Sequence, residues 1–301
     1  MIYTGIYEAK LKLPFEGETF GNKGTVLIFP GGGYEHLSER ESLPVAAAFR
    51  KEGFRSAILY YDVQSPVLGY RPLCQAAWAV GFLRQKYPKE PVFVLGFSSG
   101  GHCAGNLTVH WEGKNWRGED ALGEVRSFFP ESEETPCFFR PDAAVLCYPV
   151  ITSGEAAHRG SFLRLLGEEK DWAENQRMLI PQKCPAEVCK SPAGSIRKDY
   201  QEALHWLSLE TQVDERTPPV FLWQTQEDAE VPVQNSFLMA QSLLKAGIPM
   251  EMHIYPKGAH GLSLATKEVE QPEKNRMEDP HVAGWFQEMI QWLNNLQVTF
   301  P

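Results

Sequence analysis

The stretch from Val92 to Gly101 reads VFVLGFSSGG, and its form decides the fold. Its first residues are apolar and of strand length, and glycines stand two positions before and two positions after Ser98. Small residues continue to Gly105, as expected of a helix packed closely on a sheet. A strand, a sharp turn and a helix in this order present the Ser98 side chain at the turn, as a nucleophilic serine requires. A Gly/Ser turn of purely structural importance is the alternative interpretation.

Strand-sized apolar runs alternate with amphipathic helical patterns along the whole chain. The expected strands are Thr25–Phe29, Ser56–Tyr61, Val92–Phe97, Ala143–Pro149, Val220–Thr225 and Glu251–Tyr255. Apolar residues at helical spacing predict helices over Leu73–Tyr87, Val233–Ala246 and His281–Leu296. This alternation predicts an α/β fold with a mostly parallel central sheet flanked by helices.

A second glycine-rich segment, Pro30-Gly31-Gly32-Gly33-Tyr34, directly follows the first expected strand. Acyl transfer builds negative charge on a carbonyl oxygen, and backbone N–H groups without side chains in front of them stabilise that charge. We expect Gly32 or Gly33 to supply one such donor and Ser99 the other. A phosphate-binding loop is disfavoured because no GxGxxG or GK[ST] pattern is present. A plain turn is the remaining alternative.

An activated serine needs a base, and the base needs an acid that holds its tautomer. Asp228 and His260 follow the fifth and the last expected strand, so both should lie at the sheet edge where Ser98 projects. Glu227 is a rival for the acid, one position closer to its strand. The remaining histidines considered lie within an expected strand or helix, or precede the acid: His253, His102, His36, His158 and His205.

Two long segments, His110–Pro141 and Thr152–His205, interrupt the alternation. Each is too long for a simple connection, so we expect lid-like insertions on a single domain that spans residues 1–301. Both carry many aromatic residues, which either pack on the sheet or line a pocket over the site. The tryptophans Trp111, Trp116 and Trp172 are candidate pocket walls.

The amino-acid composition and net charge limit the kinds of molecule that the protein is expected to bind. The 301 residues are 43% hydrophobic and 22% charged, as in ordinary globular domains. Lys and Arg total 29 against 38 Asp and Glu, a net charge of −9 that disfavours nucleic acid and anionic membranes as partners. No apolar run approaches the roughly 18 residues of a membrane span, and no secretory signal is visible, so we expect a cytoplasmic protein.

The cysteines predict neither disulfides nor a metal site. Six cysteines are scattered along the chain, which favours reduced structural thiols in the cytoplasm. Cys184 and Cys189 are separated by four residues, with no second pair at zinc spacing. We therefore expect no metal and no cofactor. The oligomeric state is open, with a homodimer among the alternatives.

The segments PGGGY, GFSSGG, TPPVFLWQTQEDAEVPV and HIYPKGAHGLSLA, in this order, resemble the acetyl-xylan-esterase-like, hormone-sensitive-lipase-related esterases. The resemblance covers most of the chain and implies the α/β-hydrolase fold. It implies the following roles: nucleophile Ser98, acid Asp228, base His260, and oxyanion donors Gly32, Gly33 and Ser99. Many relatives have His at the position of Pro30, and Asp and Ala at those of Phe97 and Ser99.

The resemblance implies a serine carboxylesterase that acts on short-chain acyl esters, such as those of acetylated sugars, through an acyl-enzyme intermediate. Tyr34 and Phe97, beside the two glycine-rich turns, are the expected substrate contacts. One alternative is an amidase or peptidase that uses the same triad. Another is a binding protein that has kept the fold without turnover, which a fluorophosphonate label on Ser98 would exclude.

Overall fold

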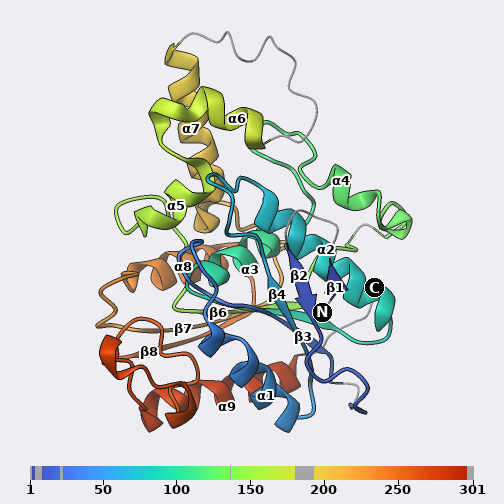
Figure 1. Ribbon diagram of the computed structural model, residues 1–301, viewed down its shortest axis with the longest axis vertical. Helices are drawn as coiled ribbons and strands as arrows, with labels where there is room; N and C mark the ends of the chain where they lie inside the picture. The colour runs from blue at the N-terminus through green and yellow to red at the C-terminus, as the bar shows by residue number, and fades with distance from the viewer. Residues whose placement is uncertain (1, 4–8, 21–22, 136, 180–192, 297–301) are drawn as a thin grey trace.

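Strands that are buried on both faces form the centre of the molecule. The structure is a computed structural model that describes residues 2–3, 9–20, 23–135, 137–179 and 193–296, and within them one sheet has the order β1-β2-β4-β3-β5-β6-β7-β8 (Figure 1). The strands are β1 (Ile2–Tyr3), β2 (Lys10–Lys12), β3 (Thr25–Phe29), β4 (Arg55–Tyr60), β5 (Val92–Phe97), β6 (Ala143–Cys147), β7 (Val220–Thr225) and β8 (Met250–Tyr255). Strands β3 to β8 are parallel, and β2 is antiparallel to β1 and β4. The predicted α/β fold with a mostly parallel sheet is confirmed.

Helices cover both faces of the sheet. The helices on or near it are α1 (Leu43–Lys51), α2 (Arg71–Lys86), α3 (Ser99–His110), α8 (Gln234–Ala246) and α9 (Pro280–Asn295). Figure 1 shows α1 and α9 on one face and α2, α3 and α8 on the other. Strand β5 serves both faces: Val92 and Val94 belong to the apolar cluster under α2 and α3, whereas Phe93 and Leu95 belong to the one under α1 and α9. Its run of apolar residues follows from this double burial.

The two long segments carry the remaining helices: α4 (Gly123–Arg126), α5 (Arg159–Leu166), α6 (Trp172–Leu179) and α7 (Ala193–Leu207). Leu122, Phe129, Phe162 and Trp172 from these segments are buried in the same apolar cluster as α2 and α3. Packing against the core, one of the two expectations for their aromatic residues, therefore describes these side chains. Helices α6 and α7 stand out from the sheet at the top of Figure 1.

The predicted elements differ from the observed ones mainly at their ends. Strand β6 was expected to reach Pro149 but stops at Cys147, because Tyr148 has a φ of 38° that no extended strand allows. Among the described residues, the four cysteines Cys74, Cys103, Cys137 and Cys147 are free, whereas Cys184 and Cys189 lie outside the described residues. The described part of the chain has no helix long and apolar enough to cross a bilayer.

Two buried histidines on α3 give the fold a pH dependence. The ring Nε2 atoms of His102 and His110 lie 2.9 Å and 3.0 Å from the carbonyl oxygens of Leu207 and Trp206. Burial lowers the pKa of His102 to about 4 and that of His110 to about 3, from an ordinary value of 6.5. Both rings therefore stay neutral in the fold at pH values where they charge in the unfolded chain.

We expect the free energy of unfolding to fall as the pH drops below 6.5. In that window the unfolded chain binds protons that the folded one does not, so each histidine costs about 1.4 kcal/mol per pH unit until its folded pKa is reached. Urea titrations at pH 7, 6 and 5 measure the slope. His110→Gln keeps a donor for the carbonyl and should reduce the slope by about 1 kcal/mol per pH unit between pH 6 and 5. An unchanged slope in that variant would contradict the assignment.

Candidate active site

Ser98 occupies the turn between β5 and α3. Its backbone has φ 53° and ψ −119°, a conformation that costs a non-glycine residue about 1–3 kcal/mol. Backbone hydrogen bonds hold it there: the Ser98 N–H donates to the Cys147 carbonyl at 3.0 Å, and the Ser98 carbonyl accepts from the His102 and Val150 N–H groups. In this turn 8% of Ser98 is exposed.

The glycines around Ser98 are required by close backbone contacts. A Cβ on Gly96 would lie 2.1 Å from the Gly100 carbonyl oxygen, and one on Gly100 would lie 2.2 Å from the Phe29 carbonyl oxygen. A Cβ on Gly101 would come within 2.9 Å of Pro149 Cβ. Any side chain at these positions would push α3 away from β3 and β5 and displace the serine.

The structure brings together the three residues that the sequence assigned to catalysis. His260 Nε2 lies 2.8 Å from Ser98 Oγ, and His260 Nδ1 lies 2.7 Å from Asp228 Oδ2. The three residues follow β8, β5 and β7, whose carboxyl ends share one edge of the sheet. His260 is 7% exposed and Asp228 6%, so the pair is shielded from bulk water.

Backbone donors fix the carboxylate of Asp228. Its Oδ1 accepts from the Glu230 N–H at 3.0 Å and the Val231 N–H at 2.8 Å, which leaves Oδ2 for His260. Gln224 Nε2 donates to Oδ2 at 3.3 Å. The rival acid, Glu227, has an exposed side chain, and the structure places Asp228 rather than Glu227 beside the histidine.

The loop after β8 that carries His260, which we call the histidine loop, is held by residues that do not belong to the triad. The Arg276 Nε donates to the His260 carbonyl at 2.7 Å, and the Tyr148 ring meets the His260 ring edge to face at 5.1 Å. At Gly261, which has φ 81°, a Cβ would come within 2.8 Å of the Arg276 guanidinium. The small neighbour of His260 therefore makes room for the arginine that holds the loop.

The first glycine-rich loop presents backbone donors near Ser98. The Gly31 N–H is already used, since it donates to Glu41 Oε2 at 2.8 Å. Gly32 and Gly33 have φ values of 134° and 66°, and within the described part of the chain their N–H groups have no acceptor. The N–H of Ser99, at the first position of α3, has no intrahelical partner either.

Glu41 and Tyr148 connect this glycine loop to the histidine loop, and sequence reasoning missed both. The buried Glu41 carboxylate accepts from Gly31 N–H and, at 2.7 Å, from the Tyr148 hydroxyl. The same hydroxyl accepts from the Ser263 N–H at 2.9 Å. Burial, and then the Glu41 carboxylate, raise the pKa of Tyr148 well above its ordinary value, so the hydroxyl keeps its proton. The pattern of the sequence around these two residues carries no signal for this contact.

The two expected substrate contacts are wrong. Tyr34 is fully buried, its φ is 62°, and its hydroxyl lies 2.8 Å from His102 Nδ1 beneath the loop. Phe97 is also fully buried and packs against Tyr148 and Trp285 on the α9 face of the sheet. Strand alternation explains Phe97, because it shares a face with Phe93 and Leu95.

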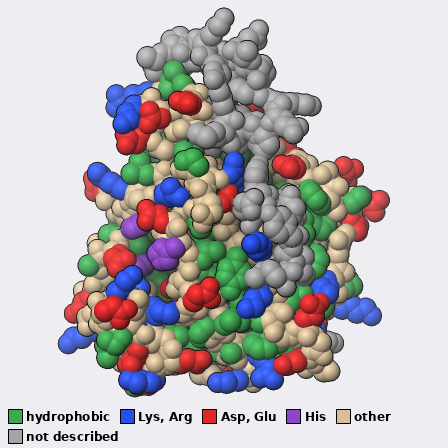
Figure 2. All heavy atoms as spheres, viewed as in Figure 1, with side chains coloured by type: hydrophobic (Ala, Val, Ile, Leu, Met, Phe, Trp, Pro, Cys, Tyr) green, Lys and Arg blue, Asp and Glu red, His purple; other side chains and the backbone are tan. Residues whose placement is uncertain are grey.

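A histidine that chain order had set aside lies beside the glycine loop. A Cβ on Gly33 would be 3.8 Å from His158 Cε1, and His158 Nδ1 lies 2.9 Å from the Ser161 hydroxyl at the start of α5. Burial, and then the charge of His260, lower the pKa of His158. Figure 2 shows histidine side chains gathered beside acidic ones on the drawn face of the molecule.

The tryptophans expected as pocket walls lie elsewhere. Trp172 is fully buried and donates through Nε1 to Asp199 Oδ2 at 2.7 Å, so it offers no face to a substrate. Trp111 and Trp116 line a pocket at the carboxyl end of α3, whereas Ser98 precedes its amino end. The sequence prediction that these three side chains surround the serine is therefore wrong.

Comparison with known proteins agrees with the fold. Residues 187–292, which include Asp228 and His260, match the model of the prolyl oligopeptidase family. Endo-1,4-beta-xylanase B from Butyrivibrio fibrisolvens is 33% identical over 251 residues. That match covers 81% of this chain but 33% of the relative, so the chain spans about a third of the relative's length.

Solved structures are similar over nearly the whole chain. An acetyl ester-xyloside bifunctional hydrolase from Caldicellulosiruptor lactoaceticus is 30% identical, with a TM-score of 0.66, over 95% of this chain and 86% of that one. A sugar hydrolase from Lactococcus lactis is 25% identical, with a TM-score of 0.63, over 95% and 93%. A carboxylesterase from Lactobacillus plantarum, 21% identical with a TM-score of 0.64 over 95% and 90%, shares the fold.

The fold and these matches define a hydrolase. The chain belongs to the α/β-hydrolase family, in its acetyl-xylan-esterase-like group of esterases.

Proposed function

We propose that the protein is a serine carboxylesterase that cleaves short-chain acyl esters, acetylated sugars among them, through an acyl-enzyme intermediate. The hydrogen-bonded series Ser98, His260 and Asp228 is the observation that carries this proposal. A serine hydroxyl 2.8 Å from an imidazole nitrogen whose other nitrogen contacts a fixed carboxylate has the geometry that acyl transfer needs.

In the proposed reaction Ser98 Oγ attacks the ester carbonyl carbon while His260 Nε2 takes the hydroxyl proton. Asp228 holds the Nδ1–H tautomer and stabilises the imidazolium that forms. The tetrahedral intermediate collapses as Nε2 returns the proton to the alcohol oxygen, which leaves. Water then attacks the acyl-enzyme by the same steps and releases the carboxylic acid and free Ser98.

The N–H groups of Gly32, Gly33 and Ser99 are the proposed donors to the oxyanion. Glu41 supports this role indirectly, because it holds Gly31 on one side and, through Tyr148, the histidine loop on the other. Both loops are thereby fixed before substrate arrives, which is the preorganisation that makes such donors effective.

Gly32→Ala tests the oxyanion assignment, with Gly33→Ala as its matched control. A Cβ on Gly32 would lie 2.1 Å from the His36 carbonyl oxygen, so the loop must move and take its donors with it. We expect kcat to fall about 10²–10³-fold with little change in KM. A Cβ on Gly33 would have its nearest atom at 3.8 Å, so alanine there meets only the strain of a φ of 66° and that variant should lose less. If Gly32→Ala kept the same kcat as Gly33→Ala, the glycine-rich segment would be a turn of purely structural importance.

The proposed preference for short acyl groups is supported by the small exposed fraction of Ser98 and by the His158 ring beside Gly33. The likeness to an acetyl ester-xyloside hydrolase and to a xylanase-named protein supports acetylated saccharides as substrates. Each methylene that an open groove buries gives about 0.8 kcal/mol, roughly fourfold in kcat/KM. A confined site gives the opposite trend.

A panel of aryl esters from acetyl to decanoyl, with acetylated xylan beside it, tests this preference. We expect kcat/KM to be highest for acetyl or propionyl and acetate to be released from the polysaccharide. A maximum at octanoyl or longer, with no acetate released from any acetylated sugar, would contradict the substrate class and leave the triad proposal standing.

Amide hydrolysis by the same triad is the second candidate, favoured by the match of residues 187–292 to the prolyl oligopeptidase family. Paired substrates with one acyl group, such as an aryl acetate and an aryl acetamide, discriminate between the two. We expect the ester to be cleaved at least 10³-fold faster. Comparable rates would favour the peptidase alternative.

A further inference from the structure

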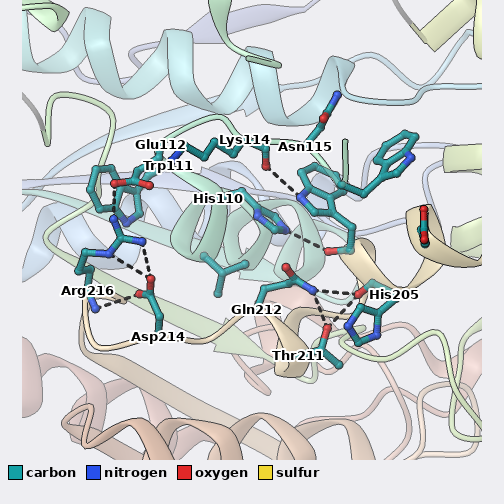
Figure 3. A pocket seen from close by; sticks show the side chains of 14 residues that line it. His110, Trp111, Glu112, Lys114, Asn115, His205, Thr211, Gln212, Asp214 and Arg216 are labelled. Atoms are coloured by element: carbon teal, nitrogen blue, oxygen red, sulfur yellow. Dashed lines mark hydrogen bonds and ion pairs between the residues drawn. The ribbon is translucent and has the colours of Figure 1, made fainter. Parts of the chain in front are cut away.

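A pocket of about 550 Å³ lies at the end of α3 opposite Ser98, and we name it the distal pocket. It is formed by the carboxyl end of α3, the segment 111–116, the carboxyl end of α7 and the segment 211–216 (Figure 3). Helix α3 has 12 residues, so the pocket and the serine are roughly 18 Å apart along it. The proposed catalysis uses none of its residues.

The aromatic part of the distal pocket is held rigidly. The rings of His110 and Trp206 stack at 4.0 Å with 18° between their planes, and His110 Nε2 lies 3.0 Å from the Trp206 carbonyl oxygen. Trp206 Nε1 in turn donates to the Lys114 carbonyl at 3.0 Å. Trp116, partly exposed, contacts the Trp206 ring at 5.9 Å. His110 and Trp206 are themselves nearly buried, so they form a rigid support, and the partly exposed Trp116 is the ring available to a ligand with a flat apolar face.

The charges in the distal pocket disfavour an anionic ligand. Its lining includes three acidic side chains, Glu112, Asp214 and Glu202, and two basic ones, Lys114 and Arg216. Arg216 pairs with Asp214 at 2.6 Å and also with Glu112, as the dashed lines in Figure 3 show. The guanidinium is therefore neutralised, and no excess positive charge is left to hold a phosphate or carboxylate ligand.

Oriented polar groups stand next to the aromatic surface. Gln212 Nε2 donates to the His205 carbonyl at 3.1 Å and to Thr211 Oγ at 2.6 Å, which fixes the amide plane. Its Oε1 has no partner within the described ranges and is left as an acceptor. The side chain of His205 is exposed beside it. Fixed hydrogen-bonding groups beside aromatic rings match the alternating hydroxyl edges and apolar faces of a sugar.

We propose that the distal pocket binds a neutral oligosaccharide at a second site, separate from Ser98. The choice of a saccharide among neutral ligands rests on the proposed function, because a polysaccharide ester would carry unesterified sugar units beyond the one being deacetylated. Binding at the distal pocket would raise the affinity for polymeric substrates and leave the cleavage of small esters unchanged. Trp116, one of the tryptophans expected from the sequence as pocket walls, would then be a wall of this second site.

Isothermal titration of the full chain with unacetylated xylotetraose, cellotetraose and mannotetraose tests the proposal, since these sugars have no ester for Ser98 to cleave. The test variant is His205→Ala with Gln212→Ala. Its control is Gln201→Ala, an exposed amide on α7 outside the pocket. We expect at least one sugar to bind, the double variant to bind it at least tenfold more weakly, and the control to match the wild type.

Kinetics provide the second readout. The double variant should hydrolyse an aryl acetate within twofold of the wild type, while its KM for acetylated xylo-oligosaccharides rises at least fivefold with kcat unchanged. Absence of binding by all three sugars, or equal affinity in the double variant, would overturn the distal pocket proposal. Failure of the wild type to cleave the aryl acetate would instead overturn the proposed esterase function. The titration would still report on the distal pocket, because it measures the binding of sugars that have no ester.

Discussion

Ser98→Ala is expected to lower kcat for aryl acetate hydrolysis by about 10⁴–10⁶-fold while the protein stays folded. The hydroxyl lies 2.8 Å from His260 Nε2, and removing it takes away the atom that would form the acyl-enzyme. Alanine keeps the Cβ, so the strained backbone at φ 53° is no harder to adopt than it is for serine. Stopped-flow or steady-state assays with a thermal melt of the same sample measure both effects.

Because the triad residues act together, His260→Ala and the double variant serve as controls for Ser98→Ala. Residues that act together lose activity non-additively, so His260→Ala should cost about as much as Ser98→Ala. The double variant should be no worse than either single one. A fluorophosphonate should label the wild type but not Ser98→Ala. Near-wild-type turnover in Ser98→Ala would mean that another residue is the nucleophile.

The central fold was predictable because its physical causes are local in sequence. Strands β3, β5 and β7 have the bounds expected from the sequence, since burial on both faces demands unbroken apolar runs. Strands β1 and β2, at one end of the sheet, have two and three residues and leave no such pattern. Residues 180–192 lie outside the described residues.

The placement of Ser98, Asp228 and His260 could be predicted from topology, because the carboxyl ends of parallel strands meet at one edge. The contact of Glu41 with Gly31 and Tyr148 could not, since it depends on a tertiary arrangement of polar groups far apart in the chain. The side-chain direction of a residue in a tight turn is equally hidden. The turn conformation of Tyr34, with φ 62°, sends its ring into the core.

For His158 and the tryptophans, a general rule about sequence order or composition did not show where the side chain lies. Chain order set His158 aside as a catalytic base, yet the fold still places it beside Gly33. Aromatic residues in long segments suggested walls around the serine, but Trp172 is in the core. The sequence indicates that such aromatic residues are buried, but it does not indicate which part of the fold buries them.

Asp228→Asn is expected to lower kcat by about 10⁴-fold with little effect on KM. Asp228 Oδ1 accepts two backbone N–H groups, from Glu230 and Val231, while Oδ2 faces His260 Nδ1 at 2.7 Å. An asparagine that turned its side-chain NH₂ group toward those two backbone N–H groups would place hydrogen-bond donors against donors. Its nitrogen must therefore face His260.

In that orientation the amide donates to Nδ1, so the proton of a neutral His260 sits on Nε2. That nitrogen then has no lone pair to accept the Ser98 proton, and the base is lost although every heavy atom keeps its place. The matched control is Glu227→Gln, one residue away and exposed, which should change kcat less than twofold. Michaelis–Menten assays of both variants with one aryl acetate provide the comparison. A large loss in Glu227→Gln with full activity in Asp228→Asn would transfer the acid role to Glu227, because only the carboxylate that fixes the histidine tautomer is sensitive to an amide replacement.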